Sequence, residues 1–125
     1  MTIKTTRWSP DTCGCSFDYE WDNAVAADVR THTFTNVVKR CPEHGARSGV
    51  ALYDAVLAEN VTKNTVLGIA NGIESAITEE NYRWSYDGAR VLQVEFVGVA
   101  LNGGKRLAIQ SAADIQFGPG KVAIL

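Results

Sequence analysis

The stretch Lys39-Arg40-Cys41-Pro42-Glu43-His44-Gly45 places a thiol and an imidazole three residues apart around a proline and directly before a glycine. Proline sets φ at about −65° within a tight turn, and glycine admits the positive φ with which a chain leaves such a turn. The turn points both ligand-type side chains at one centre, as in a zinc knuckle. Thr12-Cys13-Gly14-Cys15 supplies a second pair, with Gly14 as its flexible link.

Together the two pairs predict a metal site. The chain has 3 cysteines, an odd number that cannot all form disulfides within one molecule. Three thiols and one imidazole are a complete tetrahedral set for structural Zn²⁺, although a thiolate-rich site also suits iron. We predict Cys13, Cys15, Cys41 and His44 as ligands of Zn²⁺. The alternative is that the cysteines are small buried hydrophobic residues.

A β-hairpin would bring the two pairs together. Residues 17–22 alternate aromatic and acidic side chains, which indicates a half-buried strand, and residues 30–40 are rich in Thr and Val, as in a returning strand. The numbers of opposing residues in an antiparallel pair sum to a constant. For Cys13 and Cys41 that sum is 54, which centres the turn on residue 27, inside the connection 23–29.

The rest of the chain predicts the other elements of an α+β fold. We expect a strand at 3–8, then a helix at 47–63 that buries a stripe of Val50, Tyr53, Leu57 and Val61, with Leu52 and Val56 alongside. A second helix is expected at 64–77, weakened by two glycines. Strands at 82–86 and 90–97 flank the Asp87-Gly88 turn, and Asn102 caps a helix at 104–117 before a last strand at 121–125.

Separate runs of strands and helices favour α+β architecture. The expected fold is an antiparallel sheet with an N-terminal zinc-knuckle hairpin, a central helical segment and a C-terminal strand–helix–strand unit. We expect a single domain over 1–125, with the hairpin in 1–46 and the α+β core in 47–125.

Composition excludes several classes of protein. With 125 residues, 46% of them hydrophobic and 21% charged, the chain is neither disordered nor too short to form a core. A formal net charge of −2 leaves no basic arm for nucleic acid, and no apolar run approaches the roughly 20 residues that span a bilayer. We therefore expect no membrane partner and a cytoplasmic location.

The sequence does not match the catalytic motifs that its residues suggest. Gly118-Pro119-Gly120-Lys121 lacks the spacing of a phosphate loop, and neither histidine is followed two residues later by the glutamate of a zinc deaminase. Cys41 and His44 could form a nucleophilic pair, but no orienting group is evident. We interpret His32 as an ordinary strand residue and Asp11 as part of a turn. The protein is not expected to be an enzyme.

Three segments carry a resemblance to a group of proteins. The stretches 7–15, 41–45 and 117–122 resemble small proteins encoded in tailed-bacteriophage genomes, a group without a known activity. The two Cys/His pairs also resemble zinc-ribbon knuckles. The resemblance implies a structural protein of the virion or tail, or an accessory protein, located in the host cell cytoplasm or in the virion.

Two functions remain as hypotheses. The first is a non-catalytic, zinc-stabilised assembly or protein-binding module, with a protein partner or further copies of itself. The alternative is a nucleic-acid-binding zinc module whose basic and aromatic surface would comprise Lys39, Arg40, Arg47, Trp8 and Trp21.

Overall fold

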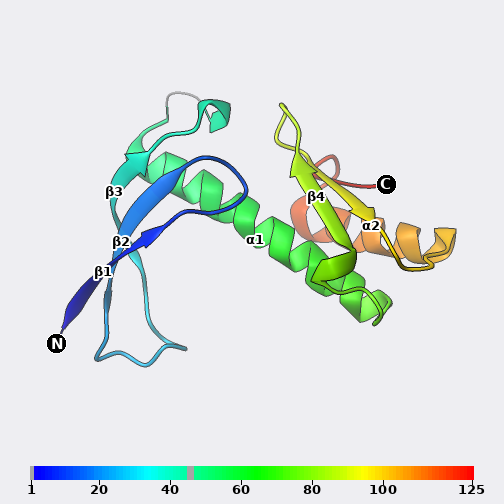
Figure 1. Cartoon of the computed structure of the whole chain (residues 1–125), viewed down its shortest axis with the longest axis horizontal. Helices are drawn as coiled ribbons and strands as arrows, with labels where there is room; N and C mark the ends of the chain where they lie inside the picture. Colours follow the sequence, from blue (N-terminus) through cyan, green and yellow to red (C-terminus); the bar gives the residue numbers. More distant parts are fainter. Residues whose placement is uncertain (1, 45–46) are drawn as a thin grey trace. The chain divides into compact units, whose positions relative to one another are not determined.

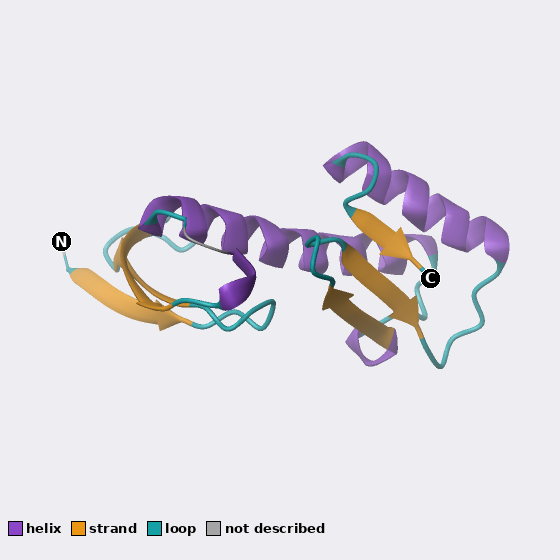
Figure 2. Cartoon of the chain, turned by 90° about the horizontal axis from the view of Figure 1, so that it is seen from above, coloured by secondary structure: helices purple, strands orange, loops and turns teal. Residues whose placement is uncertain are grey.

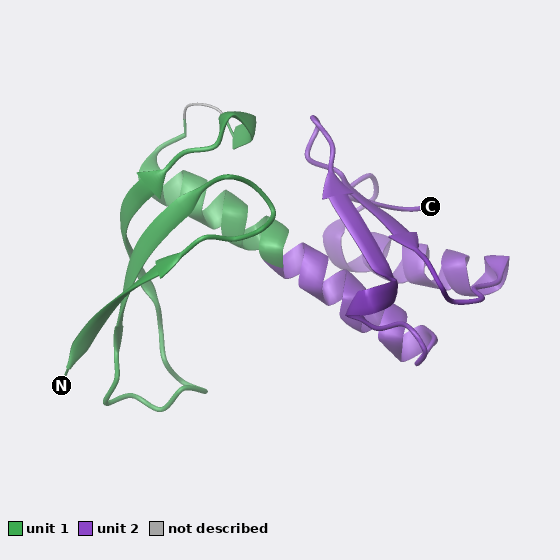
Figure 3. Cartoon of the chain, in the orientation of Figure 1, with its two compact units in different colours: residues 1–60 green, residues 61–125 purple. Residues whose placement is uncertain are grey.

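The computed structural model describes residues 2–44 and 47–125, and the chain divides into two compact units, residues 1–60 and 61–125 (Figure 3). Its elements are β1 (Ile3–Trp8), β2 (Ser16–Asp22), β3 (Thr33–Lys39), η1 (Pro42–His44), α1 (Gly49–Ile73), η2 (Glu79–Asn81), β4 (Tyr82–Tyr86), β5 (Leu92–Phe96), α2 (Gly103–Phe117) and β6 (Val122–Ile124) (Figure 1). The predicted α+β class is confirmed. The boundary between the units lies inside α1, whereas the sequence suggested a division at 46/47. That the chain behaves as a single domain stays a prediction.

In the first unit, β1, β2 and β3 form an antiparallel sheet in that order. Phe17 lies opposite Val37, and Asp18 lies opposite Asn36, so both pairs have the predicted register sum of 54. Irregularities between Ser16 and Phe17 and between Asp18 and Tyr19 shift the flanking pairs by one. The hairpin therefore has its expected register, with two local bulges.

The core of the first unit lies between this sheet and the first half of α1 (Figure 2). Leu52 and Val56 of α1 are fully buried there together with Phe17 of β2. The ring centroid of Tyr53 lies 5.4 Å from that of Phe17 and 5.3 Å from that of Phe34. Aromatic packing thus supplies much of the apolar contact in this unit.

In the second unit, β4, β5 and β6 form a mixed sheet. β4 and β5 pair antiparallel, while β5 and β6 pair parallel and are connected through α2, as the predicted strand–helix–strand unit requires. The Asn102 side chain accepts a hydrogen bond of 2.8 Å from the Lys105 amide, which confirms the predicted cap. Gln110 of α2 bonds the carbonyl of Val122 and the amide of Ile124, so its amide group pairs with the backbone of β6.

The loop between β4 and β5 is longer than the sequence suggested, and β5 begins at Leu92 rather than at Arg90. Arg90 has a φ of 59°, and its amide donates to the carbonyl of Asp87. The Asp87 carboxylate also accepts from the Val91 amide. These contacts form a local turn that displaces the first residues of the expected strand.

Helix α1 corrects two expectations. It is one continuous helix that ends at Ile73, whereas the sequence suggested separate helices at 47–63 and 64–77. The expected apolar face is confirmed only in part. Leu52 and Val56 are fully buried, as are Val66 and Ala70 further along α1, whereas Val50, Leu57 and Val61 are 59%, 39% and 49% exposed.

Among residues 2–44 and 47–125, no helix combines the length and the apolar character needed to cross a membrane.

We predict that Gly68→Ala stabilises the protein by about 0.5–1 kcal/mol, because glycine is unfavourable inside a helix. An added Cβ at Gly68 would meet no atom within 4 Å. The measurement is the free energy of unfolding in urea. Gly118→Ala is the matched control and should destabilise, because Gly118 has a φ of 92°. A Gly68→Ala protein no more stable than wild type would contradict a helix that continues through this position.

Candidate metal centre

The residues predicted as ligands are brought to one place in the first unit. Cys13 and Cys15 lie in the loop between β1 and β2, whereas Cys41 and His44 lie just beyond the end of β3. One ligand atom from each of the four residues lies within 4.8 Å of all the others. In a tetrahedral zinc site, metal–ligand distances of about 2.0–2.3 Å place the ligand atoms roughly 3.5–3.8 Å apart. The cluster therefore has the dimensions of a site that closes around a metal ion with small side-chain adjustments.

Local backbone structure positions the Cys41–His44 pair. Pro42, Glu43 and His44 form the 3₁₀ turn η1, which folds the imidazole back toward the preceding thiol. Gly45, expected to let the chain leave this turn, lies outside the described residues. Gly14, expected as the flexible link between Cys13 and Cys15, does not have a positive φ, and an added Cβ would meet the Cβ of Cys41 at 3.7 Å, an ordinary contact.

Hydrogen bonds connect the ligand-type groups to one another. The amide of Cys41 donates to the sulfur of Cys15 over 3.2 Å, which joins the two halves of the cluster. The sulfur of Cys41 lies 2.9 Å from Nδ1 of His44. An amide directed at a sulfur favours the thiolate, the form that binds metal.

Burial sets the protonation of the thiols. Cys15, Cys41 and His44 are buried, with 1%, 5% and 5% of their surface exposed, and Cys13 is half-buried. Burial raises the pKa of the Cys13 thiol to about 12. Burial also raises the pKa of Cys15 and outweighs the amide hydrogen bond from Cys41. At Cys41, burial acts in the same direction, but hydrogen bonds with His44 and Cys15 prevail and lower its pKa.

A carboxylate beside this cluster contacts His44, so the histidine has the orienting group that was not evident from the sequence. Oε2 of Glu59, on α1, lies 2.6 Å from Nε2 of His44. Their side chains are 14% and 1% exposed, respectively. Glu59 carries no motif, and the only available signal was its position on a helix that follows the Cys41–His44 turn.

The remaining candidates do not belong to the group of potential ligands. His32 precedes β3 instead of lying inside it, and its ring centroid is 4.7 Å from that of Tyr19. Asp11 supplies no atom to the group of potential ligands. The two histidines of the chain therefore have different surroundings, and His44 alone belongs to the cluster.

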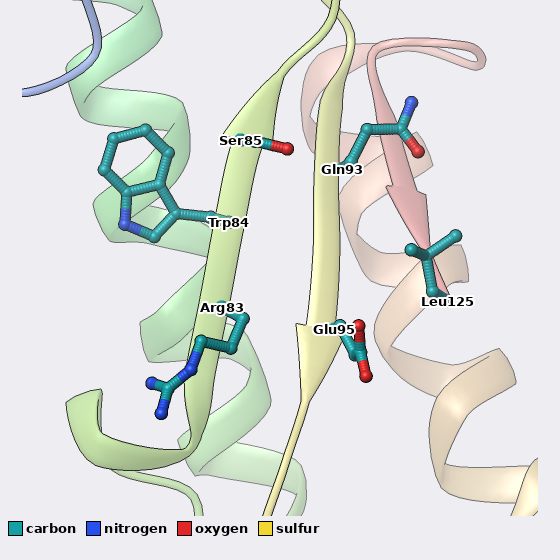
Figure 4. Close-up of a pocket in the computed structure, with 6 residues that line it drawn as sticks. All are labelled: Arg83, Trp84, Ser85, Gln93, Glu95 and Leu125. Atoms are coloured by element: carbon teal, nitrogen blue, oxygen red, sulfur yellow. The ribbon is translucent and has the colours of Figure 1, made fainter.

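The second unit has a small cavity on its sheet, lined by Arg83, Trp84, Ser85, Gln93, Glu95 and Leu125 (Figure 4). Its volume is about 130 Å³, below the roughly 300 Å³ at which ligand pockets usually begin. Cross-strand pairing places Arg83 opposite Glu95 and Ser85 opposite Gln93. This cavity is better explained by polar pairing on a sheet face than by ligand binding.

Comparison with known proteins identifies no relative. No protein-family model matches the chain, and neither the curated proteins nor the solved structures give a significant match. The class of site defined by the geometry is a possible metal-binding centre with three sulfur donors and one imidazole.

We predict that each Zn²⁺ ion bound at pH 7 releases at least two protons. The raised pKa values of Cys13 and Cys15 keep both thiols protonated at this pH, and metal binding requires thiolates. Acidification should therefore weaken binding. A zinc titration in weak buffer with a pH indicator counts the protons, and Cys13→Ser should release fewer. Binding without proton release would contradict coordination by these thiols.

Proposed function

We propose that Cys13, Cys15, Cys41 and His44 hold one structural Zn²⁺ ion, and that the protein is a non-catalytic, zinc-stabilised assembly or protein-binding module. The observation that carries this proposal is the convergence of the ligand atoms to within 4.8 Å of one another. Three sulfurs and one imidazole nitrogen match the preferences of zinc in tetrahedral sites.

The composition of the first core supports a structural role for the metal. Within the described residues, the buried hydrophobic cluster of this unit comprises Cys15, Phe17, Cys41, Leu52 and Val56, so it includes two of the proposed ligands. A unit of about 60 residues buries a smaller share of its surface than a larger domain does, and small units often gain stability from a metal or disulfides. Zinc bound by these cysteines would join the β1–β2 loop to the end of β3 and so complete the core.

The closed ligand set supports a role without catalysis. Catalytic zinc usually retains one coordination position for water, and four protein ligands occupy every position of a tetrahedral site. Three of the proposed ligands are also buried, which keeps a substrate away from the ion.

Exposed apolar side chains on the edges of the first sheet support binding of a protein. β1 and β3 each pair only with β2 among the described strands. Ile3 on β1 and Val38 on β3 are 51% and 40% exposed. Unpaired edges that carry apolar side chains are suited to strand addition by another chain or a second copy. Together with the resemblance to bacteriophage-encoded proteins, this favours a role in a virion, a tail or an accessory assembly.

The nucleic-acid alternative has weaker support. The ring of Trp8 packs against those of Phe17 and Tyr53. The guanidinium of Arg30 covers Trp21 at 4.2 Å from its ring centroid. Both tryptophans expected to stack on bases are thus engaged within the protein.

We expect the purified protein to contain one zinc ion per chain and Cys41→Ser to lose it, with a decrease of roughly 3–5 kcal/mol in the free energy of unfolding. Native mass spectrometry measures the metal. Hydrogen exchange should show lost protection in β2 and retained protection in β5, because the ligands belong to the first unit. His32→Asn is the control and should keep its zinc. A metal-free, stable wild-type protein would refute the proposal.

We also expect the zinc-loaded protein to self-associate through the edges of the first sheet. Ile3→Lys and Val38→Lys should each weaken association at least tenfold, because a charge on an exposed edge opposes strand addition. Sedimentation velocity over a range of concentrations measures this. Leu107→Lys, on α2, is a matched control at another exposed apolar residue. A wild-type protein that stays monomeric and binds no virion protein would count against the assembly role.

A further inference from the structure

The two ring nitrogens of His44 face different groups. Nδ1 lies 2.9 Å from the sulfur of Cys41, and Nε2 lies 2.6 Å from the carboxylate of Glu59. A carboxylate only accepts hydrogen bonds, so when the ring is neutral, as metal binding requires, this contact places its proton on Nε2. The lone pair of the neutral ring is then on Nδ1, directed toward the thiols.

From this geometry we propose that Glu59 is a positioning residue of the metal centre. It holds the Nε2 proton of His44, fixes the orientation of the ring, and thereby presents Nδ1 to the metal. This inference rests on the proposed zinc function and specifies which nitrogen binds and which helix supports it. Because Glu59 lies on α1, the metal centre is connected to that helix as well as to the β1–β2 loop and η1.

Burial strengthens this assignment. The side chain of His44 is 1% exposed and that of Glu59 is 14% exposed, so water competes little for their hydrogen bond. A carboxylate that accepts from a metal-bound histidine fixes its tautomer and increases the basicity of the coordinating nitrogen.

An ion pair with protonated His44 is the competing interpretation of the same contact. In that case Glu59 would contribute to folding, and the imidazole would have no lone pair for a metal. The two interpretations differ in which ring nitrogens of His44 carry a proton once zinc is present. A spectroscopic measurement on the wild-type protein can determine this.

The first experiment is a ¹⁵N NMR measurement of the histidine side chains in the zinc-loaded wild-type protein. We expect the shifts of His44 to show a metal-bound Nδ1 and a protonated Nε2, and those of His32 to stay unchanged by zinc. Binding through Nε2, or a ring protonated on both nitrogens, would overturn the proposal. A wild-type protein that binds no zinc at all would instead refute the proposed function itself.

Variants then measure the contribution of Glu59. Zinc affinity, from competition with a chromophoric chelator, should fall 10–100-fold in Glu59→Ala and less than tenfold in Glu59→Gln, because the amide oxygen still accepts from Nε2. Asp54→Ala removes an exposed carboxylate from the same helix and should bind zinc like wild type. Equal zinc affinity in Glu59→Ala and wild type would overturn the proposal.

If Glu59→Ala does not fold, the NMR result and the zinc affinity of Glu59→Gln decide. A loss of zinc affinity in Glu59→Gln as large as 100-fold would contradict a role based on hydrogen-bond acceptance.

Discussion

The proposed metal centre of the first unit depends on the convergence of three thiols and one imidazole at the end of the hairpin. Two of these thiols belong to the buried hydrophobic cluster, and the amide of Cys41 bonds the sulfur of Cys15 across the gap between two loops. Without a cation, burial keeps at least Cys13 and Cys15 protonated, and the cluster offers only weak sulfur contacts. With a bound Zn²⁺ ion, the same sulfurs and imidazole would form strong coordination bonds to the metal. The loops and the sheet would then share one point of attachment.

The second unit has a different basis for stability. Its buried cluster contains residues from α1, from the segment between α1 and η2, from the mixed sheet and from α2. Ile77, Leu92, Val94 and Ile109 are fully buried in it. Side-chain hydrogen bonds supplement this core, because Gln110 pairs with the backbone of β6 and Asn102 caps α2. Among the described residues, ten buried residues form the cluster of the second unit, whereas the cluster of the first unit has five, two of which are cysteines of the candidate metal centre. The second unit therefore has the larger apolar core.

Local patterns predicted the parts of the fold that depend on local chemistry. The cluster of Cys13, Cys15, Cys41 and His44 followed from two short motifs. The central register of the hairpin followed from the positions of those motifs, although two bulges shift the flanking pairs by one. Asn102 was recognised because capping depends on a residue type at a defined position. By contrast, α1 carries apolar residues on two faces, and periodicity cannot indicate which face meets a sheet. Of the apolar residues expected on this helix, Leu52 and Val56 are therefore buried, whereas Val50 and Leu57 are exposed.

Glu59 shows the same limit at the candidate metal centre. A carboxylate on a helix usually faces solvent, so its contact with His44 became visible only in the folded chain. The measurement that tests the central claim most directly is X-ray absorption at the zinc edge on the purified protein. The account predicts three sulfur ligands at about 2.3 Å and one nitrogen ligand at about 2.0–2.1 Å. A spectrum with fewer sulfurs, with water in the coordination shell, or without bound zinc would contradict it.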